Sequence, residues 1–313
     1  MIGPGRIARS FARDLKLTDS GRIVAVGSRS QERADAFADE FDVPHRHDSY
    51  EALVADSEVD VVYVATPHPA HYPNASLALE QGKAVLVEKA FTMNAHEARD
   101  LVSRARSKRL FLMEAMWTRF LPHIAEIRRL VADGALGEIQ TVIADHGRWF
   151  PKDPGLRTLA PELGGGALLD LGVYPVSFAS MVLGAPDRIV SLVDPAFTGV
   201  DGQTSMMFGY PNGAHALLSC SCLALSPIRA AIVGTEARIE VAADFFAPTS
   251  FDLIARDGTR RHFEPPHEGR GLRHQADEVA RCLQEGLVES PSMPLDETIS
   301  IMETMDAVLA HAR

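Results

Sequence analysis

Gly3-Pro4-Gly5-Arg6-Ile7-Ala8, near the start of the chain, is the stretch that decides the fold. It has the pattern Gly-x-Gly-x-x-Ala and leads into a predicted helix over residues 7–17. In a dinucleotide-binding fold the first glycine makes a tight turn and the second lets backbone N–H groups approach a pyrophosphate. The small third residue lets the helix pack on a strand. The pattern therefore predicts a cofactor site formed by Gly3, Gly5, Arg6 and Ile7 at the positive end of a helix.

Only Met1 and Ile2 precede this turn. A central strand of several residues normally precedes such a turn. Because only two residues are present here, we expect the first strand to be largely missing. Its neighbours should then lose ladder hydrogen bonds and buried apolar surface, each buried side chain being worth roughly 1.5–3 kcal/mol. On this ground we expect the true chain to begin several residues earlier and the present chain to bind its cofactor weakly.

Composition limits the remaining function classes. The 313 residues predict about two domains of roughly 100–200 residues each. A net charge of −11 with no basic block argues against a nucleic acid or an anionic membrane as partner. We see no apolar run of the ~18 residues that a membrane helix needs, and no signal peptide. The protein should therefore be a globular one whose partner is a small molecule.

The chain has three cysteines, which favours a reducing cytoplasm over a disulfide framework. Cys220 and Cys222 lie two apart in an apolar run, so a strand would turn both to one face. Zinc would need further ligands close by. Buried free thiols are the favoured interpretation, and we expect no metal.

The order of strand and helix signals predicts two domains. Up to about residue 115 short apolar strands alternate with helices, as in a parallel sheet covered by helices. From residue 189 to residue 264 several alternating strands follow one another without a long helix, which favours an antiparallel sheet. We predict a Rossmann domain over residues 1–118 and, over residues 119–313, an α+β domain with a large, mostly antiparallel open sheet.

The end of the second strand distinguishes NADP from NAD. An NAD site usually carries an acidic residue there, which holds the ribose 2′-hydroxyl. Here the strand runs into Ser28-Arg29-Ser30, with no acidic residue. A guanidinium beside hydroxyl groups suits a 2′-phosphate. Ser28 and Arg29 therefore predict NADP rather than NAD, although Arg29 could also simply begin a solvated loop.

Two later strands also end in polar residues, at the edge where open α/β sheets bind ligands. Thr66-Pro67-His68 follows one strand, and we expect Thr66, Pro67 and His71 to contact the cofactor. His68 and His71 could be a metal pair, but no third ligand is near in sequence. Glu88-Lys89 ends the next strand, and an ammonium there could stabilise an alkoxide. A lysine in such a place is more often a solvated strand end.

The densest motif is the run from Gly164 to Pro175. Its three glycines would allow a ligand to approach the backbone closely. Asp170 and Tyr174 are four apart, so a helix places them on one face. A tyrosine needs a nearby cation to act as an acid–base group near neutral pH, and Lys89 is the candidate. A capped helix with a half-buried tyrosine is an equally good interpretation of the residues alone.

Taken together and in order, these motifs and Glu114-Ala115-Met116-Trp117-Thr118-Arg119-Phe120 resemble the Gfo/Idh/MocA oxidoreductases over essentially the whole chain. The resemblance is greatest to the dimeric dihydrodiol dehydrogenase and NADP-dependent xylose dehydrogenase branch. It implies that Lys89 and Tyr174 are catalytic, that Asp170 helps to bind substrate, and that the second domain forms a homodimer. It also implies pocket positions for Trp117, Arg119, Phe120 and Trp149. The family usually has proline after the lysine, and here Ala90 follows.

The sequence thus predicts an NADP-dependent oxidoreductase. Hydride would pass between the nicotinamide and a secondary alcohol or carbonyl of a sugar or cyclic diol, with Glu88 and Lys89 beside the cofactor. Two alternatives stay open. One is a non-catalytic regulatory protein that senses a dinucleotide, although it would not need Lys89 and Tyr174. The other is a redox-assisted lyase or glycosidase that keeps its cofactor.

Overall fold

The computed structural model describes residues 1–310, and the chain folds into two compact units. Unit 1 comprises Met1–Phe120 and Glu268–Ile299, and unit 2 comprises Leu121–His267 and the chain from Ser300. The first boundary lies two residues after the predicted one. The segment Glu268–Ile299, which the prediction placed in the second domain, packs with unit 1 instead.

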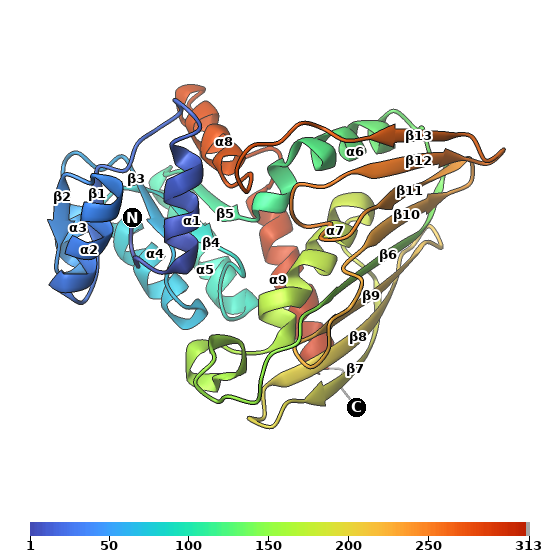
Figure 1. The fold of residues 1–313 in the computed structure, drawn as a ribbon, viewed down its shortest axis with the longest axis horizontal. Helices are drawn as coiled ribbons and strands as arrows, with labels where there is room; N and C mark the ends of the chain where they lie inside the picture. Colours follow the sequence, from blue (N-terminus) through green and yellow to red (C-terminus); the bar gives the residue numbers. More distant parts are fainter. Residues whose placement is uncertain (311–313) are drawn as a thin grey trace. The chain divides into compact units, whose positions relative to one another are not determined.

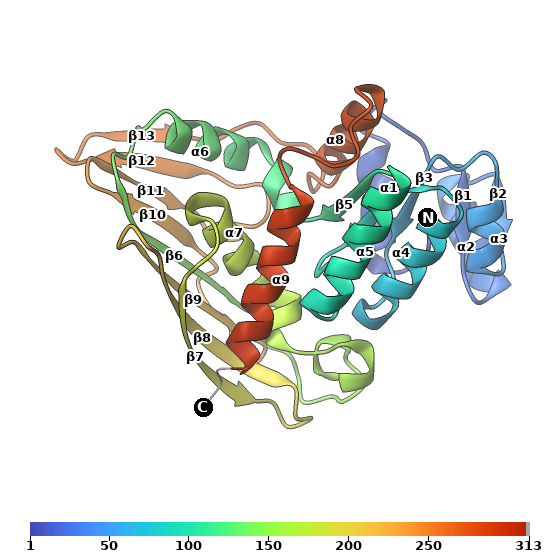
Figure 2. The same cartoon turned by 180° about the vertical axis from the view of Figure 1, so that it is seen from behind.

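Unit 1 is a parallel sheet covered by helices (Figure 1). In space β2 pairs with β1, and β3, β4 and β5 pair in that order, all in parallel. Figure 1 shows α1 in front of the strands, and Figure 2 shows α4 and α5 on the opposite side. The elements are α1 (Arg6–Leu15), β1 (Ala25–Gly27), α2 (Gln31–Phe41), β2 (His45–His47), α3 (Tyr50–Ala55), β3 (Val61–Val64), α4 (His71–Glu80), β4 (Ala84–Glu88), α5 (Ala95–Lys108) and β5 (Leu112–Ala115).

Met1 and Ile2 take the central position between β1 and β3. Ile2 forms a parallel bridge to each strand: its N–H donates to Tyr63 O at 2.9 Å, and Ala65 N–H donates to its carbonyl at 2.9 Å. Gly27 N–H donates to Met1 O at 2.9 Å. The expectation that the neighbouring strands lose their ladder partners is therefore wrong at these two positions. A cavity of ≈ 530 Å³ lies beside Met1. Its lining comes from the segments before β1 and β3 and from side chains of α1 and α8, among them Phe11 and Val279.

Asp14 explains why Glu268–Ile299 returns to unit 1. This buried carboxylate of α1 accepts the N–H of Arg270 at 3.0 Å and of Leu272 at 2.7 Å. These two residues precede α8 (Arg273–Gln284), which is followed by α9 (Leu295–Ala310). Buried backbone donors need partners, so one side chain of the first helix holds a segment more than 250 residues later in the sequence. Such a distant partner is not visible in local patterns.

Unit 2 is built on one eight-stranded sheet with the order β13-β12-β11-β10-β6-β9-β8-β7 (Figure 1). Neighbouring strands are antiparallel except β6 and β9, which run parallel, so the sheet is mostly antiparallel, as predicted. Helix α7 packs on β6 and β9, and Ser191 of β7 donates to Val308 O of α9. The strands and helices are α6 (Pro122–Ala132), β6 (Ile139–Gly147), α7 (Val173–Leu183), β7 (Arg188–Pro195), β8 (Asp201–Gly209), β9 (His215–Ser221), β10 (Ala230–Gly234), β11 (Ala237–Val241), β12 (Phe251–Ala255) and β13 (Arg260–Phe263).

One apolar stretch of unit 2, Pro161–Leu183, is long and apolar enough to cross a membrane by length and composition. The expectation that the chain holds no such run is wrong on this measure. The most apolar part of the stretch is 78% buried inside the fold. A core helix of a globular domain has the same composition, so burial explains the stretch.

Candidate active site

The glycine turn is shaped by its neighbours and leaves a helix end uncapped. Gly3 has φ +84°, and a Cβ there would lie 2.9 Å from Thr66 Cγ2, so both the conformation and the space require glycine. Gly5 is the N-cap of α1; no side chain caps this helix, and a Cβ on Gly5 would meet no atom within 4 Å. The first-turn N–H groups of Arg6 and Ile7 have no acceptor within the helix. The turn therefore fits a pyrophosphate.

The loop after β1 carries the residues predicted to select NADP. Ser28 is buried, with its N–H donated to His47 O at 3.1 Å, and its hydroxyl accepts the N–H of Ser30 at 3.3 Å. Arg29 between them is exposed. Ser30 caps α2 by accepting Arg33 N–H at 3.4 Å. The loop is thus held by its serines and presents a guanidinium, which matches a 2′-phosphate.

His71 joins the loops after β3 and β4. Its Nε2 lies 2.8 Å from Thr66 O and its Nδ1 lies 2.9 Å from Ala90 O. The ring is buried, and the ring of His68 meets it edge-on at 5.5 Å. His71, predicted to contact the cofactor, thus has both ring nitrogens on backbone carbonyls and positions the loop that carries Lys89. Thr66 is buried beside it, and Pro67 is exposed.

Glu88 and Lys89 close β4 in different environments. The buried Glu88 carboxylate accepts the Tyr63 hydroxyl at 2.5 Å and the Lys89 N–H at 3.3 Å. Lys89 is half-buried. The Lys89–Ala90 peptide bond is cis. The hydrogen bonds of Glu88 therefore fix the end of β4 and the backbone from which the Lys89 side chain extends.

The segment Trp117–Phe120 forms a short 3₁₀ turn in unit 1. Arg119 is only 4% exposed and pairs with both carboxylate oxygens of Glu297, at 2.9 and 3.1 Å. This two-point geometry is the strong form of an ion pair. Trp117 is buried beside it and Phe120 is half-buried. Arg119, predicted to line the pocket, thus anchors the start of α9.

In unit 2 the run from Gly164 to Pro175 forms one π-helical turn, Leu168–Gly172, which continues into α7. Asp170 accepts Arg157 Nη2 at 2.5 Å and Thr158 Oγ1 at 2.9 Å. Single π turns inside helices are frequent at functional sites. Asp170 is therefore held on the π turn by two residues of the preceding loop, which no sequence motif had singled out.

Tyr174 belongs to an aromatic cluster. Its ring centroid lies 5.2 Å from that of His146 and 4.8 Å from that of Phe246, and the latter two rings stack at 4.4 Å. The tyrosine is buried. His146 lies in β6 and Phe246 in the loop before β12. Neither was predicted, because only the fold brings these two residues beside Tyr174. Trp149, predicted to contact substrate, is 65% exposed after β6.

Two of the three glycines are required by close contacts within unit 2. A Cβ on Gly165 would lie 2.8 Å from Ala160 O, and one on Gly166 would overlap Asp201 Oδ1. Asp201 accepts the N–H of Leu168 at 2.6 Å, and burial raises its pKa to about 6. Gly166 thus admits a carboxylate that caps the π turn.

Cys220 and Cys222 are buried, as predicted. A Cβ on Gly172 would lie 2.8 Å from Cys220 Sγ, and Cys222 Sγ donates to Gly202 O at 3.2 Å. Burial raises the pKa of both thiols. They therefore pack as neutral thiols beneath the π turn.

Known protein families match both parts of the chain. Residues 1–116 match a family described as "Oxidoreductase family, NAD-binding Rossmann fold". Residues 124–240 match the "GFO/IDH/MocA C-terminal domain". Together with the fold, the first match defines the class as nicotinamide-dinucleotide oxidoreductases. The chain belongs to the Gfo/Idh/MocA family of that class.

Relatives with assigned names are similar along the whole chain. The trans-1,2-dihydrobenzene-1,2-diol dehydrogenase of Mus musculus is 37% identical over 98% of this chain and 94% of its own length. That of Homo sapiens is 36% identical with the same coverage. The 3-ketoreductase KijD10 of Actinomadura kijaniata, solved with NADP and TDP-benzene, has a TM-score of 0.87 at 25% identity, covering 100% of this chain and 96% of its own. These findings confirm the predicted family, fold class, oxidoreductase function and dinucleotide cofactor.

Proposed function

We propose that the chain is an NADP-dependent oxidoreductase that transfers hydride between the nicotinamide and a secondary alcohol or carbonyl of a cyclic diol or sugar. The observation that carries the proposal is the full-length similarity to enzymes named for a cyclic diol, which covers 97–98% of this chain. KijD10, named a 3-ketoreductase, was solved with NADP, and its name supports the same chemistry at a secondary alcohol.

Lys89, Tyr174 and Asp170 are the residues proposed to act. NADP⁺, when bound, supplies the hydride acceptor at carbon 4 of its nicotinamide ring. Tyr174 takes the proton of the substrate hydroxyl during oxidation and returns it during reduction. The Lys89 ammonium favours the phenolate form of Tyr174 and stabilises the developing alkoxide. Asp170, held by Arg157 and Thr158, orients a neighbouring hydroxyl of the substrate.

The local structure supports these roles. Tyr174 is held by the rings of His146 and Phe246, so its hydroxyl has a defined direction. The Lys89 backbone is held by Glu88 and by the contact between His71 and Ala90. Fixed geometry of this kind supplies much of the rate enhancement in enzymes. Trp117, Arg119, Phe120 and Trp149 remain proposed contacts of the substrate.

An absorbance screen at the reduced-nicotinamide band tests the reaction. Cyclic trans-diols, aldoses and anhydrosugars are offered with NADP⁺, and the best substrate is used for variants. Tyr174→Phe should lower kcat by about 10²–10⁴-fold, and Lys89→Met should lower it comparably, while the Kd of NADP changes little. Tyr50→Phe and Lys108→Met serve as matched controls on α3 and at the end of α5.

Three results would overturn the mechanism. The first is near-normal turnover by Lys89→Met or Tyr174→Phe. The second is consumption of substrate without net change in NADPH, which would indicate the lyase or glycosidase alternative. Dinucleotide binding without turnover on any substrate offered would indicate the sensor.

Arg29 gives a separate test of the cofactor. Arg29→Ala removes the proposed contact with the 2′-phosphate, and a hydrogen bond to a charged group is worth ~1.5–3 kcal/mol. The KM for NADP should rise about 10–150-fold while the KM for NAD stays nearly constant. Equal changes in the two KM values would show that Arg29 does not read the 2′-phosphate.

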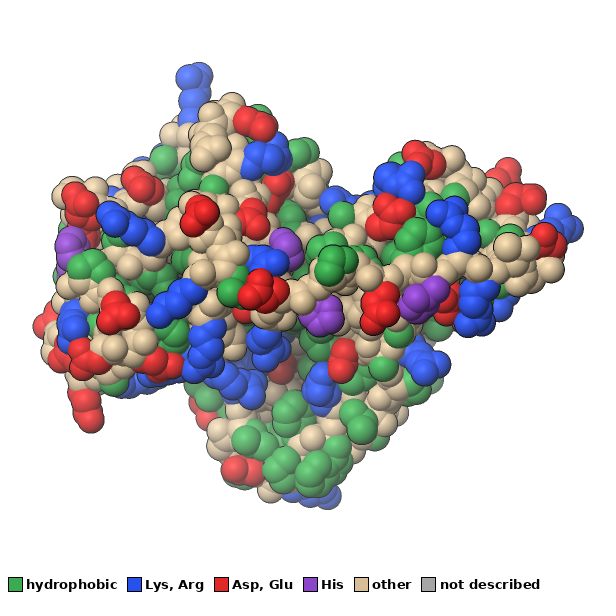
Figure 3. Space-filling view, turned by 45° about the horizontal axis from the view of Figure 1, so that its top comes forward, with side chains coloured by type: hydrophobic (Ala, Val, Ile, Leu, Met, Phe, Trp, Pro, Cys, Tyr) green, Lys and Arg blue, Asp and Glu red, His purple; other side chains and the backbone are tan. Residues whose placement is uncertain are grey.

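We further propose that unit 2 forms a homodimer through the open face of its sheet. Val190, Met207, Leu217 and Ile143 are register partners on β7, β8, β9 and β6, and each is 44–58% exposed. Contiguous apolar patches on a surface mark interaction sites. In contrast, acidic and basic side chains are interspersed over unit 1 on the face drawn in Figure 3. Light scattering measures the mass of the particle in solution. Met207→Lys should give the mass of a monomer, whereas the control Leu17→Lys on unit 1 should keep the mass of a dimer. An unchanged mass for Met207→Lys would refute this interface.

We propose a reducing compartment, the cytoplasm, as the location. Cys220, Cys222 and Cys282 are all free and buried, and cytosolic proteins keep their thiols reduced. Protein isolated with alkylation in denaturant should carry three labels, and fewer labels would argue against this location.

A further inference from the structure

The edge strand β2 places two imidazoles on one side of the strand. His45 and His47 are two apart, and alternate residues of a strand point to the same face. Their rings meet at right angles with centroids 6.5 Å apart. The register pairs Ala25 with His45 and Gly27 with His47, which fixes both backbones against β1. None of the residues assigned above to the cofactor or the substrate is part of this pair.

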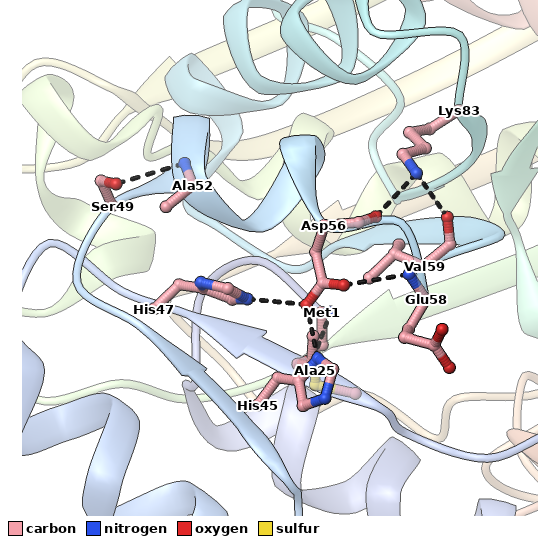
Figure 4. Close-up of polar contacts among 10 residues, drawn as sticks. All are labelled: Met1, Ala25, His45, His47, Ser49, Ala52, Asp56, Glu58, Val59 and Lys83. Atoms are coloured by element: carbon pink, nitrogen blue, oxygen red, sulfur yellow. Dashed lines mark hydrogen bonds and ion pairs between the residues drawn. The ribbon is translucent and has the colours of Figure 1, made fainter.

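Asp56, just after α3, faces both rings (Figure 4). Its Oδ2 lies 2.6 Å from His45 Nδ1 and 3.0 Å from His47 Nε2. The other oxygen accepts the Glu58 N–H at 3.0 Å, and Lys83 Nζ donates to the backbone carbonyls of Asp56 and Val59, both at 2.8 Å. The carboxylate is therefore held in place by its own loop while one oxygen points at two imidazole nitrogens.

The environment keeps this carboxylate charged. The Glu58 N–H and the His45 ring hold the pKa of Asp56 well below its usual range. The side chains of His45, His47 and Asp56 are 40%, 21% and 8% exposed. The carboxylate is thus the least exposed group of the cluster, and both imidazoles are in part exposed to solvent.

The distances fit a small divalent cation. The three ligand atoms all lie within 4.8 Å of one another. Zinc binds nitrogen and oxygen ligands at about 2.0–2.2 Å, so tetrahedral neighbours lie about 3.3 Å apart. To reach that separation, His47 Nε2 would need to move away from Asp56 Oδ2 by about 0.3 Å and His45 Nδ1 by about 0.7 Å. Two imidazoles and one carboxylate suit zinc, cobalt or nickel rather than magnesium or calcium.

We propose that His45, His47 and Asp56 form a binding site for a divalent transition-metal ion, with water completing the coordination. The Glu58 N–H and Lys83 form the outer contacts that orient the carboxylate. A bound ion joins β2 to the loop before β3. The Ser28 N–H donates to His47 O. The bound ion therefore also stabilises the strand that borders the Ser28–Ser30 loop.

The test uses the full chain without a histidine tag, after treatment with a chelator. Co²⁺ is added and its visible absorption is followed, and Zn²⁺ is titrated by calorimetry. One equivalent should bind, and bound Zn²⁺ should raise Tm. His47→Asn and Asp56→Asn should each weaken binding by more than about 100-fold, beyond the loss expected for an outer contact. His262→Asn is the matched control, because His262 pairs with Asp252 at 2.8 Å but with no second imidazole among residues 1–310.

His45→Asn keeps the test decisive if Asp56→Asn does not fold, since His45 is the most exposed of the three. It should lose the Tm rise with Zn²⁺ and keep the circular dichroism of the wild type. The proposal is overturned if Co²⁺ binds no better than to the His45→Asn variant, or if His262→Asn abolishes the binding. In either case His45, His47 and Asp56 form only a hydrogen-bonded cluster that connects β2 to the loop before β3.

Discussion

Glu114 in β5 should make the stability of unit 1 fall as the pH rises. The side chain is fully buried, and burial raises its pKa from 4.5 to about 7, while a 3.3 Å bond from the Thr298 hydroxyl and the nearby Arg119 oppose the rise. Folding therefore favours the protonated acid. The stabilisation is complete below pH 4.5 and is lost as the pH rises through 7.

The size of the effect follows from the pKa. Each unit corresponds to ~1.36 kcal/mol, so the rise from 4.5 to about 7 corresponds to about 3 kcal/mol between acid and alkaline conditions. Glu114→Gln is neutral at every pH and should remove this slope. At pH 8 the variant should be more stable than the wild type by about 2 kcal/mol, after ~1 kcal/mol is lost through an altered hydrogen bond.

Two tryptophans make the measurement specific. Trp117 is buried in unit 1, three residues from Glu114, and Trp149 is exposed in unit 2. In a Trp149→Phe background, fluorescence during urea unfolding reports unit 1 alone. Free energies of unfolding at pH 5 and pH 8 are compared between chains with and without the Glu114→Gln substitution. A slope that survives in Glu114→Gln, or a variant less stable than the wild type at pH 8, would refute the reasoning.

Three further substitutions test the packing. Asp14→Ala leaves the buried N–H of Leu272 and the N–H of the exposed Arg270 without their acceptor and should cost about 1–3 kcal/mol. Equal Tm values for variant and wild type would contradict the role of Asp14. Gly172→Ala brings a methyl group to 2.8 Å from Cys220 Sγ and should cost about 1–3 kcal/mol, which a second substitution, Cys220→Ala, should partly restore. If the double variant is no more stable than Gly172→Ala, this contact is not the cause. Asn94→Ala removes the cap of α5 and should cost ~1 kcal/mol in urea unfolding; an unchanged midpoint would show that the cap contributes nothing.

Local patterns sufficed for the elements and their class. The glycine turn and the alternation of strands and helices depend on residues a few positions apart, and the structure confirms these elements. Hydrophobic periodicity also indicated the second sheet. The short polar strand β2 was missed because its three residues, His45-Arg46-His47, carry no periodic signal. Helix α3 was missed as well, since its six residues span less than two turns.

The tertiary structure decided which groups meet. Arg119 pairs with Glu297 across 178 residues of sequence, and Asp201 meets the triple glycine across more than 30. His71 bridges two strand ends, and Asp56 meets the imidazoles of β2. Which atoms come within hydrogen-bond distance depends on how strands pair and loops close, and no local pattern contains that information. The residue types near Gly3 therefore indicated a nucleotide from sequence alone, whereas only packing showed that Ile2 supplies the backbone bridge between β1 and β3.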